Sequence, residues 1–211
     1  MTPAAKRSYA RRMPPAERRT QLLDAALQII NSQGVAAVSV DAVSRLCGVT
    51  RPVFYTQFTD TQHLLRTLLD RETRCALDQI MSATPIPTGA VDPVRWFVEG
   101  TRAVVAAVAE RPSTWRAILL PIGEVPDPVH TYLQQAEETI TVRFAEIIRF
   151  FLQGREHTDE VDVELLARLL LRLLGEAGRL VLEDSSDYPP DRIIRFAATV
   201  AEGFFIRYPE V

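Results

Sequence analysis

The stretch Ser39–Phe58, SVDAVSRLCGVTRPVFYTQF, predicts two short helices separated by a tight turn. Ser39 can cap the first helix, because its hydroxyl can accept a hydrogen bond from a free backbone N–H. Gly48 follows the last residue of the helical pattern, where glycine adopts the left-handed conformation that ends a helix at little steric cost. Between them, apolar side chains recur on one side at spacings of three and four: Val40, Val43 and Cys47, with Leu46 beside them.

The second helix begins after Thr50, which is its predicted cap. Pro52 falls in the first turn, where the missing N–H of proline costs no hydrogen bond. Val53 and Phe54 are expected to face inward. This leaves an outward face of four residues: Arg51, Tyr55, Thr56 and Gln57. Two helices joined in this way form either a helix-turn-helix, whose second helix enters the major groove of DNA, or a plain helical hairpin.

A glycine, a small capping residue, an aromatic pair and a closing phenylalanine follow one another in a specific order here: Val43, Gly48, Val49, Thr50, Phe54, Tyr55, Phe58 and Leu64. This order resembles the amino-terminal signature of the tetracycline-repressor (TetR) family. The resemblance covers roughly residues 18–69, and beyond them only chain length and helical pattern agree. It implies an all-α, homodimeric, sequence-specific DNA-binding regulator, usually a repressor that a small ligand releases from its operator.

Arg51 is the strongest candidate for reading a base, because arginine can bond a guanine edge through two donors. A phosphate contact is the alternative for Arg51, and Pro52, Thr56 and Gln57 would then read the sequence. Hydroxyl groups suit phosphate contacts, and the resemblance gives Tyr55 that role. The predicted DNA-binding residues are therefore Ser39, Thr50, Arg51, Pro52, Tyr55, Thr56, Gln57 and Thr61.

Two positions depart from the family pattern. Thr61 stands where the family usually has a lysine that contacts phosphate, and Gln57 stands where a histidine is frequent. Thr61 can still donate its hydroxyl, but one positive charge is missing. The departure lowers the expected affinity for DNA, which the arginines of the amino-terminal arm could offset.

Charge is distributed unevenly along the chain. Residues 1–60 hold eight basic side chains and four acidic ones, a net charge of +4, whereas the whole chain carries −3 and the remainder therefore −7. Such an asymmetry favours a basic nucleic-acid module on an acidic body, although a solvated imbalance of charge would look the same.

No sequence motif points to catalysis or to a metal. The chain has no glycine-rich phosphate loop, no HExxH and no GxSxG, and its two cysteines lack metal-ligand spacing. We therefore expect no cofactor, no metal and no enzymatic activity. Cys47 and Cys75 lie in helical patterns and no apolar run could cross a membrane, so a reduced, cytoplasmic protein is expected. A redox pair stays open.

The chain divides into four parts: a flexible basic arm (1–14), the helix-turn-helix domain (15–58), a connecting helix (59–84) and an effector-binding and dimerisation domain (85–211). A capping box of Thr59 and Gln62 is expected to start the connecting helix. Apolar spacing and prolines predict the helices of the body: Asp92–Arg111, Ser113–Leu120, Val129–Gln153, Asp162–Leu182 and Pro190–Arg207. We found no credible strand, so the fold class is all-α.

The leucine-rich helix Asp162–Leu182 has an apolar stripe wider than one monomer core needs. We therefore expect a homodimer that pairs this helix and Pro190–Arg207 with their two-fold mates. Polar groups inside apolar helices, together with nearby aromatic residues, suggest a pocket for a small hydrophobic effector, although core packing would explain each aromatic singly. The predicted ligand-binding residues are Trp96, Phe97, Glu99, Arg102, Trp115, Tyr132, Arg143 and Phe144.

Two other functions fit the same residues. The first is a helix-turn-helix regulator that a partner protein controls and that binds no ligand. The second is a helical enzyme or carrier for a hydrophobic substrate, which would need polar pairs within hydrogen-bond reach in the body.

Overall fold

The computed structural model describes residues 13–124, 127–183 and 186–209, and over these residues it contains helices and no strand, as the sequence predicts. Most of the predicted basic arm, residues 1–12, lies outside them. The α-helices are α1 (Pro15–Gln33), α2 (Val40–Cys47), α3 (Arg51–Tyr55), α4 (Thr61–Ala83), α5 (Pro93–Glu110), α6 (Pro112–Leu119), α7 (Asp127–Leu152), α8 (Val163–Leu182) and α9 (Pro190–Arg207). Two 3-10 turns complete them, Val35–Ala37 and Thr158–Glu160.

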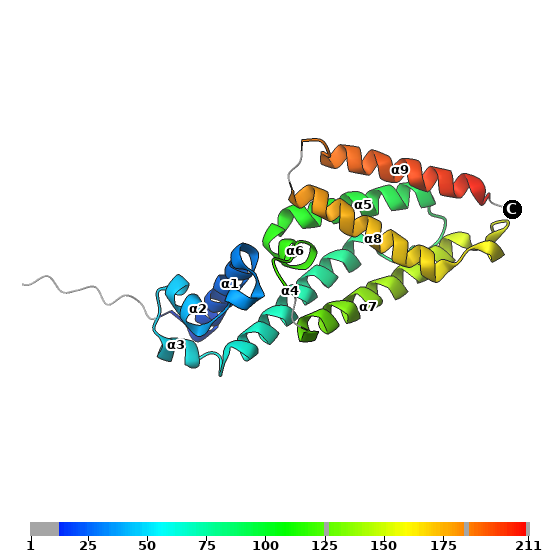
Figure 1. Cartoon of the computed structure of the whole chain (residues 1–211). Helices are drawn as coiled ribbons and strands as arrows, with labels where there is room; N and C mark the ends of the chain where they lie inside the picture. Colours follow the sequence, from blue (N-terminus) through cyan, green and yellow to red (C-terminus); the bar gives the residue numbers. More distant parts are fainter. Residues whose placement is uncertain (1–12, 125–126, 184–185, 210–211) are drawn as a thin grey trace, which may run out of the picture.

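Helices α1, α2 and α3 form a small module at one end of the molecule (Figure 1). Its core consists of side chains that are almost completely excluded from water: Leu22, Val43, Phe54, Phe58 and Leu64. Leu64 and Leu68 belong to α4, so the core of the module continues into the first turns of the connecting helix. That shared core joins the module to the body.

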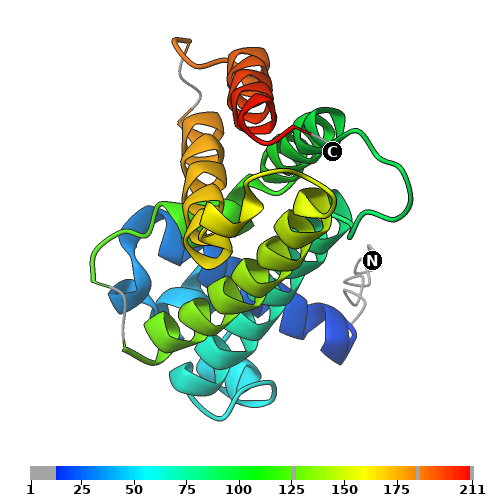
Figure 2. The same ribbon diagram turned by 90° about the vertical axis from the view of Figure 1, so that its right-hand side faces the viewer.

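The body is a bundle in which α5 is central. It packs against α4 on one side and against both α8 and α9 on another, and α7 packs against α4 and α8. Figures 1 and 2 show α9 lying along α5, at the side of the bundle away from α4. Helices α8 and α9 therefore form an outer edge of the body.

The ends of the motif helices follow the sequence signals in part. The Ser39 hydroxyl accepts a hydrogen bond from the Ala42 N–H at 3.1 Å, and Gly48 has a left-handed φ of 64°, so both predictions are confirmed. Thr50 precedes α3, but its side chain makes no capping bond. The capping box at Thr59 is wrong, because the Asp60 carboxylate accepts the helix N–H of His63 at 2.7 Å. An ionised carboxylate is the stronger acceptor there.

Helix α6 links the module to the body. At its amino-terminal end, Ser113 accepts a bond from the Asn31 side chain of α1, at 2.8 Å. At its carboxyl-terminal end, the Leu119 carbonyl accepts a bond from Arg179 Nε of α8, at 3.0 Å. Between them, Thr114 Oγ1 donates to the buried carboxylate of Glu72 in α4, at 2.5 Å. Helix α6 is thus hydrogen-bonded to α1, α4 and α8.

Gly34 lies where the module touches the segment after α6. It has a φ of 85°, and a Cβ placed there would lie 2.5 Å from the backbone oxygen of Ile122. Gly48 has a similar φ, but a Cβ there would meet nothing within 4 Å. Their backbones differ as well, because ψ is 168° at Gly34 and 33° at Gly48, which lies in the left-handed helical region.

We predict that Gly34→Ala destabilises the protein more than Gly48→Ala. A Cβ in the left-handed helical conformation of Gly48 costs about 1–2 kcal/mol. The conformation of Gly34 is one that essentially only glycine adopts, so its strain is at least as large. Overpacking adds about 1–3 kcal/mol at Gly34 alone. Urea denaturation of both variants measures the difference, and equal losses of unfolding free energy would contradict the close contact with Ile122.

Candidate DNA interface and ligand cavity

The predicted DNA-binding residues cluster on one surface of α2, α3 and the start of α4. Six of them are exposed and two are half-buried: Ser39, Thr50, Arg51, Pro52, Tyr55 and Thr56 are exposed, and Gln57 and Thr61 are half-buried. Phe54 anchors this surface from below and meets the Tyr55 ring edge to face, with centroids 5.6 Å apart. The packing of Phe54 thus fixes the position of the residues beside it on α3.

Some polar groups of this surface already have partners within the protein. Thr56 Oγ1 donates to the Val53 carbonyl at 2.7 Å, and Gln57 Nε2 donates to Thr56 Oγ1 at 3.2 Å. Arg19, which could have reached the DNA backbone, donates to the Gln57 carbonyl at 2.7 Å and lies over the Phe58 ring. Arg19 therefore braces α1 against the end of the motif.

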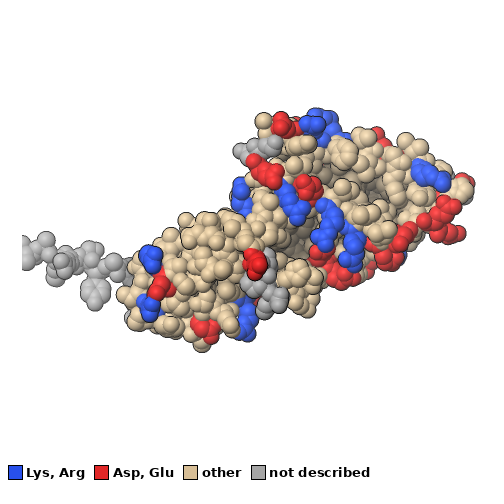
Figure 3. Space-filling model, in the orientation of Figure 1, with Lys and Arg blue, Asp and Glu red and all other residues tan. Residues whose placement is uncertain are grey.

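Arg51 forms an ion pair with Asp41 in the first turn of α2. Its Nε donates to Asp41 Oδ1 at 2.5 Å, and its Nη2 donates to Asp41 Oδ2. Figure 3 shows basic and acidic atoms side by side at this end of the molecule. Sequence analysis missed Asp41, because only the turn geometry brings it near a residue ten positions later. An acidic residue inside a DNA-binding motif was the available signal.

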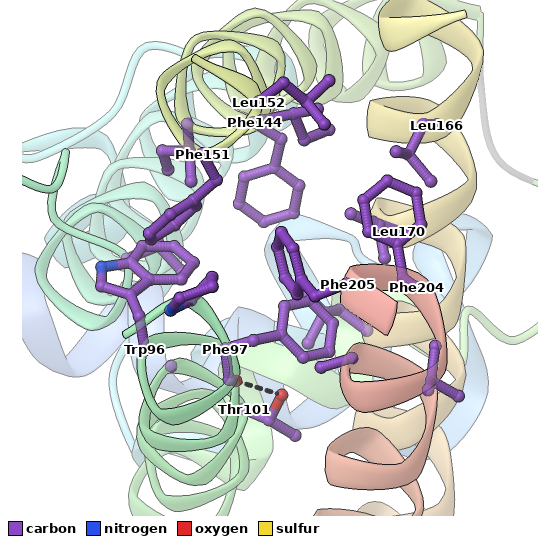
Figure 4. Close-up of a pocket in the computed structure, with 18 residues that line it drawn as sticks. Trp96, Phe97, Thr101, Phe144, Phe151, Leu152, Leu166, Leu170, Phe204 and Phe205 are labelled. Carbon is purple, nitrogen blue, oxygen red and sulfur yellow. Dashed lines mark hydrogen bonds between the residues drawn. The ribbon is translucent and has the colours of Figure 1, made fainter. Parts of the chain in front are cut away.

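The body encloses an apolar cavity of about 110 Å³ between α5, α7, α8 and α9. Six aromatic side chains line much of it: Trp96, Phe97, Phe144, Phe151, Phe204 and Phe205 (Figure 4). Two threonines also line it, but their hydroxyls are occupied, because Thr84 donates to the Ile80 carbonyl and Thr101 to the Phe97 carbonyl. The cavity can therefore accommodate a hydrocarbon group, and its two hydroxyls have no free proton to donate.

A more open groove of about 380 Å³ continues from the cavity between α8 and α9. The two spaces share part of their lining, including Phe97, Leu170 and Val200. The outer wall of the groove contains Leu173 and Phe196, which are 52% and 64% exposed. The cavity thus opens toward the outer edge formed by α8 and α9.

The amino-terminal geometry matches a known family. Residues 22–68 match the family model described as bacterial regulatory proteins, tetR family. This match makes residues 22–68 a tetR-family DNA-binding domain. Its α2–α3 unit is the DNA-binding helix-turn-helix of a transcriptional regulator. Among curated proteins, no relative matches the chain.

Solved structures of tetR-family regulators share the fold over most of their length. A TetR-like transcriptional regulator from Rhodococcus sp. RHA1 is 17% identical, with 90% of this chain and 96% of that chain covered and a TM-score of 0.71. The fatty acid degradation regulator FadR from Bacillus halodurans is 16% identical, with the same coverage and a TM-score of 0.68. The regulatory protein TetR from Rhodobacter sphaeroides is 20% identical, with 86% and 97% covered and a TM-score of 0.64.

Three of the eight predicted ligand-binding residues line the cavity: Trp96, Phe97 and Phe144. The structure places the other five elsewhere. Trp115 is buried and donates to Gln79 Oε1, and Arg143 Nε donates to the Thr84 carbonyl. Glu99 and Arg102 are exposed and pair with each other at 3.7 Å.

Tyr132 is the last of these five residues, and it lies near Asp70 of α4. Burial, followed by a hydrogen bond to Asp70, raises the pKa of its phenol. Sequence analysis predicted that these polar groups line a pocket, because they interrupt otherwise apolar helices. In the structure Arg143 bonds a backbone carbonyl, Tyr132 bonds Asp70, and Glu99 and Arg102 pair with each other.

The cavity residues that sequence analysis missed come from α8 and α9. They include Leu166, Leu170, Leu174, Val200, Phe204 and Phe205. Their helices were assigned to the dimer interface because of their apolar width. The apolar surface of α8 has two parts. One side of the helix lines the cavity, and the exposed Leu165, Leu169 and Leu173 lie on another side.

Two other kinds of site are absent from the described residues. No group of three or more metal-ligating side chains occurs in residues 13–124, 127–183 and 186–209. Within the same ranges, no helix is long and apolar enough to cross a membrane. Both cysteines are free thiols, and burial raises the pKa of Cys47 above its usual value.

Proposed function

We propose that this tetR-family regulator represses transcription from a palindromic operator and is released by a hydrophobic small molecule. The observation that carries the proposal is an enclosed aromatic cavity in the same chain as the helix-turn-helix. Because the two cavity hydroxyls are already bonded, the buried part of the effector should be hydrocarbon. As a regulator of transcription, the protein should act in the cytoplasm.

The name of one structural neighbour suggests a chemical class for the effector. The fatty acid degradation regulator from Bacillus halodurans shares the fold, and its name associates that protein with fatty acids. A fatty acyl chain is flexible and unbranched, and it would fit the narrow cavity and its continuation between α8 and α9. Saturated fatty acids of graded length are therefore the first probes for this protein.

A route from the cavity to the DNA module supports release by the effector. Helix α8 lines the cavity and is bonded to α6 through Arg179 and the Leu119 carbonyl. A Cβ on Gly178 would lie 2.7 Å from the Leu119 side chain, so α6 and α8 approach closely there. An effector that favours a displaced α8 would shift α6 and, through Asn31 and Glu72, the module. The ligand acts only through its different affinity for the two arrangements.

Two copies should bind one operator. Recognition helices of a symmetric dimer read half-sites about 34–36 Å apart, or a multiple of that distance. We propose that α8 and α9 of the two copies form the dimer contact, because three leucines of α8 are 52% exposed in the described part of the chain: Leu165, Leu169 and Leu173. An operator with two-fold symmetry follows from this arrangement.

A gel-shift assay on DNA that flanks the coding region of the protein tests the proposal. We expect sequence-specific binding that decreases when saturating fatty acid is added, while tryptophan fluorescence, to which Trp96 in the cavity contributes, reports occupancy. Fatty acid that binds the cavity without changing DNA affinity would contradict release by an effector. DNA binding that no hydrophobic compound affects would favour control by a partner protein.

A further inference from the structure

Asp41 is an acidic side chain on a surface that faces a polyanion. Its carboxylate is 51% exposed and lies in the first turn of α2, beside the predicted contact residues. Phosphates repel a carboxylate, so Asp41 weakens the general attraction of this surface for DNA. Attraction to phosphate therefore cannot be the role of Asp41 at this surface.

The ion pair with Arg51 has a defined geometry. Asp41 engages the side edge of the guanidinium, because both oxygens accept, one from Nε and one from Nη2. Arginine has five N–H groups, of which this pair uses two. The two N–H groups of Nη1 and the second one of Nη2 meet no other acceptor among the described residues. One N–H of Nη1 and the free N–H of Nη2 lie parallel and form the outer edge of the side chain.

That outer edge matches one base. Two parallel N–H groups of an arginine fit O6 and N7 of guanine in the major groove, and no other base presents two acceptors in this way. Arg51 is 63% exposed in the first turn of the recognition helix, so its outer edge is accessible. A free arginine samples many rotamers, whereas a guanidinium held by both carboxylate oxygens keeps one orientation.

We infer that Asp41 is a positioning residue that holds Arg51 for reading a guanine, so that the pair gives specificity at the expense of general affinity. The inference rests on the proposed operator binding. The hydrogen bond from Arg51 lowers the pKa of Asp41, and the charge of Arg45 lowers it further, so the carboxylate stays ionised at neutral pH. The pair thus persists under the conditions in which the protein binds DNA.

Binding-site selection on variants tests this role. Asp41→Ala should lose most of the preference for guanine at one symmetric pair of positions, about tenfold, while binding to unrelated DNA stays equal or becomes tighter. Arg51→Ala should lose the same preference, and the double variant should lose no more than Arg51→Ala alone. Asp41→Asn keeps one acceptor and should fall between wild type and Asp41→Ala.

Asp24→Ala is the matched control, because Asp24 is also an exposed acid paired with an arginine, Arg71, at 2.7 Å. It should leave the selected sequence unchanged, and thermal melts of all variants establish that they fold. A sharper preference in Asp41→Ala would overturn the inference, since Asp41 would then withhold Arg51 from DNA. An unchanged preference would also overturn it. If the wild-type protein selects no sequence, operator binding itself fails, and the inference fails with it.

Discussion

Replacing both Leu173 and Phe196 with glutamate should convert the protein into monomers and lower its operator affinity by about 10²–10⁴-fold. This range is the gain that two linked half-site contacts give over a single one. Leu173 and Phe196 lie on the outer wall of the groove between α8 and α9, and they are among the most exposed large apolar residues. Charges at these positions would have to be buried without partners if the dimer formed through this edge.

The charged residues of α8 support this choice of interface. Arg168 and Arg172 turn toward α7, where they pair with Glu138 at 3.4 Å and Glu137 at 2.5 Å. The leucines at 165, 169 and 173 therefore form a continuous apolar row, with spacings of four that place them on one face. Contiguous apolar surfaces of this kind mark interaction sites in soluble proteins.

Val142→Glu is the matched control for this experiment. Val142 is 51% exposed on α7, nearly the same fraction as Leu173, but it lies outside the groove. The control should remain dimeric on a sizing column and keep its operator affinity. A double variant that stays dimeric would place the interface on another surface of the body.

The sequence predicted most of the fold because the determining signals are local. Apolar spacing and prolines located the five helices of the body to within two residues, whereas α3 ends at Tyr55, before the Thr56 and Gln57 that were expected on its outward face. The Ser39 cap and the left-handed Gly48 were predictable because each depends on residues within one turn. The exception at Asp60 is also local, since the cap is one residue later than predicted and the Asp60 carboxylate accepts the His63 N–H.

The candidate sites were harder to predict because they depend on distant contacts. Periodicity identified the apolar faces of α8 and α9 but could not tell which part meets the cavity and which part meets solvent. The pair of Asp41 and Arg51 depends on the angle at which the turn joins α2 to α3. Glu99 and Tyr132 looked like pocket residues only because their helices are otherwise apolar. Both side chains point away from the cavity, because of their position around the helix axis.

Replacing Ala201 with leucine should remove the response to the effector while leaving DNA binding intact. Ala201 is buried on α9 and lines the cavity, so a larger side chain would occupy space that the ligand needs. Burial of hydrocarbon contributes about 0.8 kcal/mol per CH₂, so excluding three such groups from the cavity should weaken binding by roughly 2.4 kcal/mol. That loss corresponds to about a 50-fold rise in Kd, because each factor of ten is about 1.4 kcal/mol.

Ala167→Leu is the matched control, because Ala167 is completely buried in the same core but does not line the cavity. Overpacking at a site without free space should lower the unfolding free energy by about 1–3 kcal/mol. Ala201→Leu should lose less, since the cavity of about 110 Å³ lies beside it. Titration of fatty acids by tryptophan fluorescence and thermal melts measure both effects. If Ala201→Leu binds these compounds as tightly as wild type, the ligand occupies a different part of the body, and the cavity has only a packing role.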